Sequence, residues 1–174
     1  MYFVTLCVQN KEPALGDIID DEMCLSRTGE IACDNWQAIP EHTQGNVALD
    51  TFVIMPNHLH GIIAIENNGC RDVALSTDVA MRRDVAMQRL YKPHKNETMS
   101  AISPKAGELG AIIRSYKSSI MRWCNENKIP FAWQSRFYDH IIRNEKELER
   151  IRLYIEGNPS RWNEDKNHPI NTWM

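Results

Sequence analysis

The stretch that decides the fold is Met55-Pro56-Asn57-His58-Leu59-His60-Gly61-Ile62-Ile63. Its two histidines, His58 and His60, are separated by one leucine at the start of an apolar run, so on a strand both side chains leave the same face. Neutral imidazole is the commonest protein ligand for divalent metals, and the pair therefore provides half of a metal site. The alternative is a structural pair, with one ring bonded in the core and the other in contact with solvent.

The residues around the two histidines predict a β-hairpin. The composition indicates a strand at 49–55, a turn or bulge at Pro56-Asn57 and a second, apolar strand at 58–65. In this context residues 55–61 resemble the motif of the HUH single-strand nucleases, a family named for two histidines around a hydrophobic residue. The sequence of this motif is most similar to the version in the small single-tyrosine transposases.

The composition is that of an ordinary globular domain. The chain has 174 residues, of which 43% are hydrophobic and 25% charged, so one domain with a substantial core is expected. No apolar run reaches the length of a bilayer span, and the amino terminus lacks the features of a signal peptide. We therefore expect a cytoplasmic protein with no membrane partner. The five cysteines form no CxxC pair and are interpreted as free thiols.

The net charge of −3 conceals a division between the two halves of the chain. Residues 1–70 hold two basic and ten acidic side chains, whereas residues 103–162 hold eleven basic and seven acidic ones. The carboxyl half is therefore the candidate for phosphate contact, although an ordinary solvated helix surface is the alternative for each cation. The candidate DNA-binding residues are Arg114, Lys117, Arg122 and Arg136.

Hydrophobic periodicity and turn residues predict the remaining elements. In chain order we expect a strand at 2–8, a hairpin of 15–19 and 22–25, an amphipathic helix from Ser26 to before Pro40, a long amphipathic helix at 107–128, a strand at 133–142, and a helix capped by Asn144 that stops near Gly157. Together they predict an α+β domain at 1–162, with an antiparallel sheet of about five strands and helices packed mainly on one face.

Two segments do not fit this domain pattern. Residues 67–104 contain a period of six, with aspartates at 72, 78 and 84, and are interpreted as a low-complexity insertion loop. A short solenoid array is the alternative. Residues 163–174 are polar and rich in Asn and Pro, so we expect a tail.

The second half of a candidate site lies at the end of the last predicted helix. Tyr154 falls at the edge of the apolar stripe formed by Leu148, Ile151 and Ile155, and Asn158 lies four residues later on the same side. A phenol and a carboxamide are thus directed to one place. From spacing alone, a tyrosine at the rim of the core and an asparagine that caps the helix remain an alternative.

The sequence around Tyr154 extends the resemblance to the single-tyrosine transposases. Residues 133–143 and 152–159 resemble the end of the REP-associated tyrosine transposases, relatives of the IS200-like transposases, and the likeness covers most of residues 2–162 except the insertion. It implies a ferredoxin-like fold in which His58 and His60 bind Mg²⁺ or Mn²⁺, Tyr154 is the nucleophile and Asn158 supplies a further ligand oxygen. Such enzymes cut single-stranded DNA at hairpin-flanked sites through a 5′-phosphotyrosine link.

Other residues and functions remain open at this point. His140 is a reserve ligand or orienting group, and Tyr138 and Tyr116 are rival nucleophiles by residue type. One alternative function is a hairpin-DNA-binding module that no longer cuts, and another is a metal-dependent hydrolase of small phosphoesters. A purely structural role would leave the two same-face histidines and the pair of Tyr154 and Asn158 as coincidences. The residues do not distinguish a monomer from a homodimer.

Overall fold

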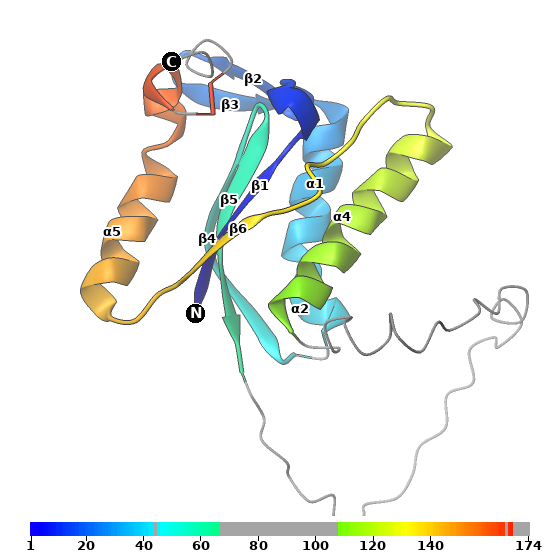
Figure 1. Cartoon of the computed structure of the whole chain (residues 1–174). Coiled ribbons are helices and arrows are strands. Elements are labelled where there is room, and N and C mark those ends of the chain that lie inside the picture. Colours follow the sequence, from blue (N-terminus) through cyan, green and yellow to red (C-terminus); the bar gives the residue numbers. More distant parts are fainter. Residues whose placement is uncertain (44, 67–107, 166, 169–174) are drawn as a thin grey trace, which may run out of the picture.

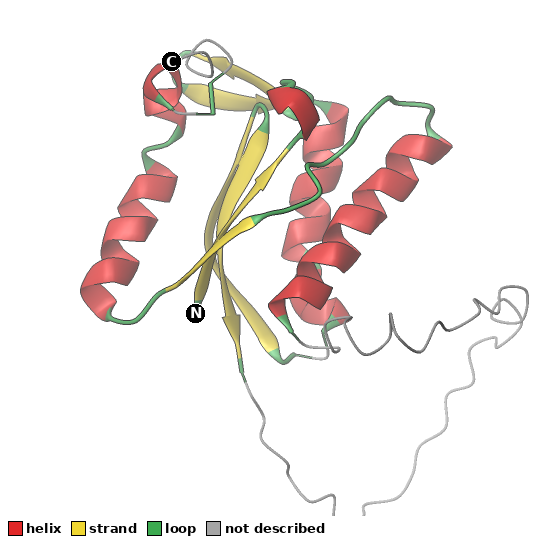
Figure 2. Cartoon of the chain, in the orientation of Figure 1, coloured by secondary structure: helices red, strands yellow, loops and turns green. Residues whose placement is uncertain are grey.

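The computed structural model describes residues 1–43, 45–66, 108–165 and 167–168 (Figure 1). Its sheets and helices follow the predicted order (Figure 2). The main sheet is antiparallel, in the order β4-β5-β1-β6, and β2 pairs with β3 in a separate ribbon. The strands are β1 (Tyr2–Cys7), β2 (Gly16–Ile19), β3 (Glu22–Leu25), β4 (Val47–Met55), β5 (His58–Ile65) and β6 (Tyr138–Ile141). The α-helices are α1 (Arg27–Gln37), α2 (Ile39–His42), α4 (Leu109–Glu126) and α5 (Glu145–Glu156).

The predicted α+β class is confirmed, while the strand count of the main sheet and the extent of the strand expected at 133–142 differ from expectation. Among the described residues the main sheet has four strands instead of about five, because β2 and β3 pair with each other in a separate ribbon. The predicted strand at 133–142 is regular only in β6, while Trp133 makes an isolated bridge to Val8. The predicted insertion at 67–104 lies outside the described residues.

The hairpin of β4 and β5 places both histidines on a central strand. Met55 pairs with His58 across the predicted turn at Pro56-Asn57. The turn is held by the segment between β1 and β2, since the Val8 N–H donates to the Asn57 carbonyl at 2.8 Å and the Leu15 N–H to the Pro56 carbonyl at 2.9 Å. The start of β5 therefore has little freedom to move.

Alternation along the strands divides the sheet into two faces. In the register of β1, Thr5 lies opposite both His60 and Tyr138, so these three side chains share one face. The other face carries the larger core and is covered by α1, α2 and α4 (Figure 1). That core includes Val4, Leu6, Leu59, Ile63, Trp36, Ile113 and Ile120.

Among the described α-helices, α5 is the one that covers the histidine face (Figure 1). The apolar side chains of α5 pack on Ile62 of β5 and form a second, smaller hydrophobic core. Its buried members are Ile62, Ile142, Leu148, Ile151 and Ile155. Asn144 caps the helix as predicted, accepting a hydrogen bond from the Glu147 N–H at 2.9 Å. The helix thereby brings its carboxyl end to the His58 end of β5.

None of the described helices is both long and apolar enough to cross a lipid bilayer.

Candidate metal and tyrosine site

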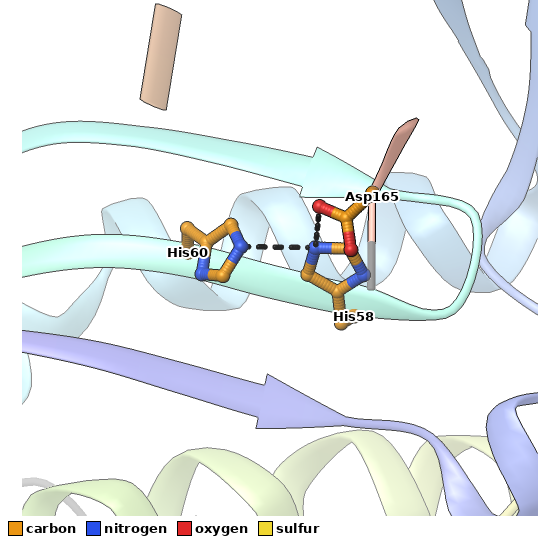
Figure 3. A group of neighbouring side chains, drawn as sticks. All are labelled: His58, His60 and Asp165. Atoms are coloured by element: carbon orange, nitrogen blue, oxygen red, sulfur yellow. Dashed lines mark hydrogen bonds and ion pairs between the residues drawn. The ribbon is translucent and has the colours of Figure 1, made fainter. Parts of the chain in front are cut away.

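The two imidazoles of the motif converge on one point. The Nε2 atoms of His58 and His60 lie 3.0 Å apart, and both residues are buried (Figure 3). Two ligand atoms at right angles around one ion, each bonded at about 2.1 Å, are separated by about 3.0 Å. The same-face arrangement predicted from the spacing therefore has the geometry of two adjacent metal ligands.

Each imidazole is oriented by a polar group on its other nitrogen. The Nδ1 atom of His58 lies 2.8 Å from Asn57 Oδ1, and that of His60 lies 2.8 Å from Thr5 Oγ1. The Asn57 amide nitrogen donates to the carbonyls of Lys11 at 3.0 Å and Asn167 at 2.8 Å, so its oxygen faces His58. Consequently His58 carries its proton on Nδ1, and the Nε2 lone pair points into the site.

A carboxylate that sequence reasoning missed completes the group. Asp165 is 8% exposed, and its Oδ2 lies 3.9 Å from His58 Nε2 (Figure 3). One ligand atom from each of Asp165, His58 and His60 falls within 4.8 Å of the others. No periodic pattern surrounds Asp165, and only the return of the chain after η3 (Pro159–Glu164) brings it here.

The same observation corrects the prediction of a tail at 163–174 for its described residues, 163–165 and 167–168. Asp165 and Asn167 are both buried, and the Asn167 carbonyl accepts the hydrogen bond from Asn57. Trp162 contributes a ring 6.0 Å from that of His58. The polar composition misled the prediction because this segment packs against the histidine site, where the Asn167 carbonyl accepts from Asn57 and the Asp165 carboxylate accepts from the Asn167 N–H. Residues 169–174 lie outside the described part.

Tyr154 faces the histidine pair from the last turns of α5. Its hydroxyl lies 3.3 Å from His60 Nε2, and the two rings are 5.3 Å apart. Burial raises the pKa of Tyr154, as does the nearby charge of Asp165, while a hydrogen bond with Asn158 opposes this shift. The phenol is therefore protonated at neutral pH, yet with an exposed fraction of 40% the residue is open to a substrate.

Asn158 presents an unsatisfied oxygen in the same place. The residue is 3% exposed, and its Oδ1 is a buried acceptor for which no hydrogen-bond partner occurs among the described residues. A buried carbonyl oxygen without a donor is costly, and a cation at the site would relieve that cost.

These side chains border a cavity of about 470 Å³. It is lined by Phe3, His60, Tyr138, Tyr154, Asn158, Arg161, Glu164 and Asp165. Arg161 is the cation of this lining, and it was not among the predicted site residues. The cavity thus combines a tyrosine, potential metal ligands and a positive charge that suits a phosphate.

Comparison with known proteins places this arrangement in context. No family model matches the chain. An uncharacterized protein of Haemophilus influenzae is 34% identical over 166 residues, covering 95% of this chain and 83% of that protein. The chain belongs to the same family as this protein. A solved REP-associated tyrosine transposase, bound to a REP hairpin, matches with a TM-score of 0.58 and 16% identity over 95% of this chain and 69% of that one.

The chain therefore has a tyrosine transposase fold, as the motif resemblance predicts. At 16% identity the likeness is one of fold, so the roles of individual residues rest on the geometry of this chain.

Within the transposase fold the rival tyrosines have different surroundings. Tyr138 lines the cavity, is 59% exposed and stacks edge-on against Phe3 at 6.4 Å. Tyr116 lies on the other face of the sheet, where it is 3% exposed and donates to the Ala32 carbonyl at 3.0 Å. Burial raises the pKa of Tyr116 well above its ordinary value. Tyr116 therefore has a core role.

His140 shares the histidine face but is paired elsewhere. Its Nε2 lies 2.8 Å from Glu147 Oε1, while the other carboxylate oxygen of Glu147 accepts the Arg143 N–H at 2.9 Å. His140 on β6 is thus paired with Glu147 in the first turn of α5, the helix that carries Tyr154.

Three of the four candidate DNA-binding cations, Arg114, Lys117 and Arg122, lie on α4, and Arg136 lies in the neighbouring segment before β6. Arg114, Arg122 and Arg136 are exposed. Lys117 is half-buried and donates to the carbonyls of Gln134 at 2.7 Å and Arg136 at 3.0 Å. The ammonium of Lys117 therefore supports the backbone of the segment before β6.

Proposed function

We propose that the protein is a metal-dependent single-strand DNA endonuclease and strand transferase that acts at hairpin DNA through Tyr154. The observation that carries the proposal is the position of the Tyr154 hydroxyl, 3.3 Å from Nε2 of His60 in the convergent histidine pair. The REP hairpin bound to the transposase of the same fold supports hairpin DNA as the substrate class.

The donor set of the site fits Mg²⁺ or Mn²⁺. His58 and His60 offer two imidazole nitrogens, while Asp165 and the unsatisfied Oδ1 of Asn158 offer hard oxygens. When bound, the cation would supply a Lewis acid that polarises a phosphate oxygen and a template that orients it. Asp165 joins Asn158 as a candidate for the ligand that the histidine pair requires.

Tyr154 would perform the covalent step. Its phenolic oxygen forms a bond to phosphorus while the bond from phosphorus to the 3′-oxygen of the DNA breaks. The phenol gives up its proton to solvent, and the leaving 3′-oxygen takes one, so the products are a 5′-phosphotyrosine and a free 3′-hydroxyl. A phenoxide is a better leaving group than a sugar alkoxide, so another 3′-hydroxyl can later reseal the strand.

The remaining cavity residues have supporting roles in this proposal. Arg161 would bind the phosphate, since a guanidinium matches the geometry of phosphate oxygens. Phe3 stacks on His60 with ring centroids 5.3 Å apart and thereby fixes the imidazole plane. Thr5 fixes it from the other nitrogen.

Covalent capture on a denaturing gel tests the proposal. Hairpin oligonucleotides from the genomic surroundings of the gene, labelled at the 5′ or the 3′ end, are incubated with Mn²⁺ or with chelator. We expect a denaturation-resistant adduct on the 3′ fragment that requires Mn²⁺. Tyr154→Phe should abolish it, while the matched variant Tyr138→Phe should retain it.

Other outcomes select the alternatives. Tight hairpin binding without any adduct indicates a DNA-binding module that no longer cuts. Metal-dependent turnover of small phosphoesters that survives Tyr154→Phe indicates a hydrolase in which water is the nucleophile.

A further inference from the structure

A second groove lies on the opposite face of the sheet from Tyr154, between α4 and the segment 130–137. Its volume is about 720 Å³. The apolar part of its lining comes from Ile113, Met121, Trp133 and Phe137, and the cations Arg114 and Arg122 stand beside it on the exposed surface of α4. The proposed chemistry at Tyr154 makes no use of this groove.

The walls of this groove are preformed. Lys117 fixes the outer wall through its hydrogen bonds to the carbonyls of Gln134 and Arg136. The Gln134 N–H donates to the Cys7 carbonyl at 2.9 Å, and Trp133 bridges to Val8, so the segment is also tied to the sheet. A ligand would therefore enter without having to order the backbone.

The lining calls for a ligand with apolar faces, hydrogen-bonding edges and negative charge. Helix α4 carries three basic residues and one acidic residue, which is complementary to a polyanion. Gln134 and Ser135 also line the groove and offer polar groups to the edge of such a ligand. Unstacked nucleobases have flat apolar faces, edge acceptors and adjoining phosphates, and they are accessible in single-stranded DNA but not in a duplex.

The groove and the Tyr154 cavity are neighbours across one edge strand. Phe137 lines the groove, while Tyr138, the next residue along the chain, lines the Tyr154 cavity. β6 is the outermost strand of the main sheet on this side, because its one partner there is β1. One flexible strand that passes over the edge at β6 would therefore reach both places.

We infer that this groove holds unstacked bases of the single-stranded DNA that flanks the phosphate attacked by Tyr154. The inference rests on the proposed function and adds a substrate subsite to it. Phe137 and Met121 contact the base faces, and Arg114 and Arg122 bind the phosphates on either side.

Equilibrium binding of fluorescent DNA tests this subsite. Hairpin oligonucleotides with 2-aminopurine at successive flanking positions are titrated with the full chain carrying Tyr154→Phe, which prevents cleavage. We expect one or two flanking positions to change in fluorescence, and Phe137→Ala to remove that change. Arg114→Ala with Arg122→Ala should raise the Kd about tenfold at physiological salt and reduce the salt slope by about 1.4, at roughly 0.7 per phosphate.

The matched control is Arg27→Ala, which removes an exposed arginine on α1 that lines neither cavity. Circular dichroism melting of each variant verifies that it is folded. The inference is overturned if Arg27→Ala weakens binding as much as the groove variants do, or if the fluorescence change persists in Phe137→Ala. Either result would leave the proposed function standing, provided that the protein with the unsubstituted Tyr154 still forms the covalent adduct. Groove-dependent binding by a protein that forms no adduct would instead overturn the proposed function and keep the subsite.

Discussion

Arg152 on α5 holds the carboxylate of Asp50 on β4 with two hydrogen bonds. The Arg152 Nε atom donates to Oδ1 at 2.9 Å and a terminal nitrogen donates to Oδ2 at 2.6 Å. Asp50 lies where the pairing of β4 with β5 shifts register, between Leu49 and Phe52. The pair joins the edge of the sheet to the helix turn just before Tyr154, and it fixes the position of that turn above the histidines.

The Asp50–Arg152 pair predicts a stability change in acid. The hydrogen bond from Arg152 lowers the pKa of Asp50 well below its ordinary value, with smaller help from Thr51. A carboxyl with a depressed pKa in the folded state contributes stability above its unfolded pKa of about 3.9 and loses it as the pH falls further. Asp50→Asn should lower the free energy of unfolding by about 1 kcal/mol at pH 7 and by less at pH 3, measured by urea denaturation. Equal losses at both pH values would contradict it.

Replacement of Gly61 should destabilise the fold. A Cβ at this position would overlap the ring of Trp36, which is fully buried, and would also crowd Phe52. We expect Gly61→Ala to cost about 1–3 kcal/mol in urea denaturation, as overpacked cores do. A smaller ring in Trp36→Phe should recover part of that cost in the double variant. If the two changes are simply additive, crowding against Trp36 is not the cause.

Asn57 should control the tautomer of His58 in the absence of metal. Its amide nitrogen is committed to two carbonyls, so only its oxygen can face the imidazole. Nitrogen NMR of the metal-free protein should show a protonated Nδ1 in His58 and mixed tautomers in Asn57→Ala. Mn²⁺ affinity of that variant, measured by electron paramagnetic resonance, should fall about tenfold or more. Unchanged tautomer and affinity in the variant would exclude this role.

Metal binding should stabilise the fold and reveal the third ligand. A ligand that binds only the folded state and is present at a concentration of 100 times its Kd stabilises that state by about 2.7 kcal/mol. Saturating Mn²⁺ should therefore raise the Tm, and chelator should reverse the effect. His60→Ala should abolish the shift. A larger loss in Asp165→Asn than in Asn158→Ala would identify the carboxylate as the ligand, and the reverse result would identify the carboxamide.

Local sequence features predicted most of the helices and strands and the relative positions of two pairs of candidate site residues. The turn at Pro56-Asn57 and the alternation after it predicted that His58 and His60 share a face, because strand geometry fixes the direction of each side chain. The 3.6-residue period likewise predicted that Tyr154 and Asn158, which follows the end of α5, are directed to one place, and both line the same cavity. Hydrogen bonds and steric limits within a few residues carry this information.

The arrangement of these pieces depends on contacts between distant residues. The amide of Asn57 binds the carbonyl of Asn167, which lies 110 residues away in sequence, and this contact belongs to the chain return that brings Asp165 to the histidines. Composition predicted a tail there, because it records the polarity of a segment but not the partners that satisfy it. The sequence by itself determined the histidine pair, the helix with its tyrosine and the antiparallel character of the sheet. Only the tertiary structure decided that Asp165 completes the group, that Lys117 supports backbone, and that α5 rests on the histidine face, since each depends on packing between elements far apart in the chain.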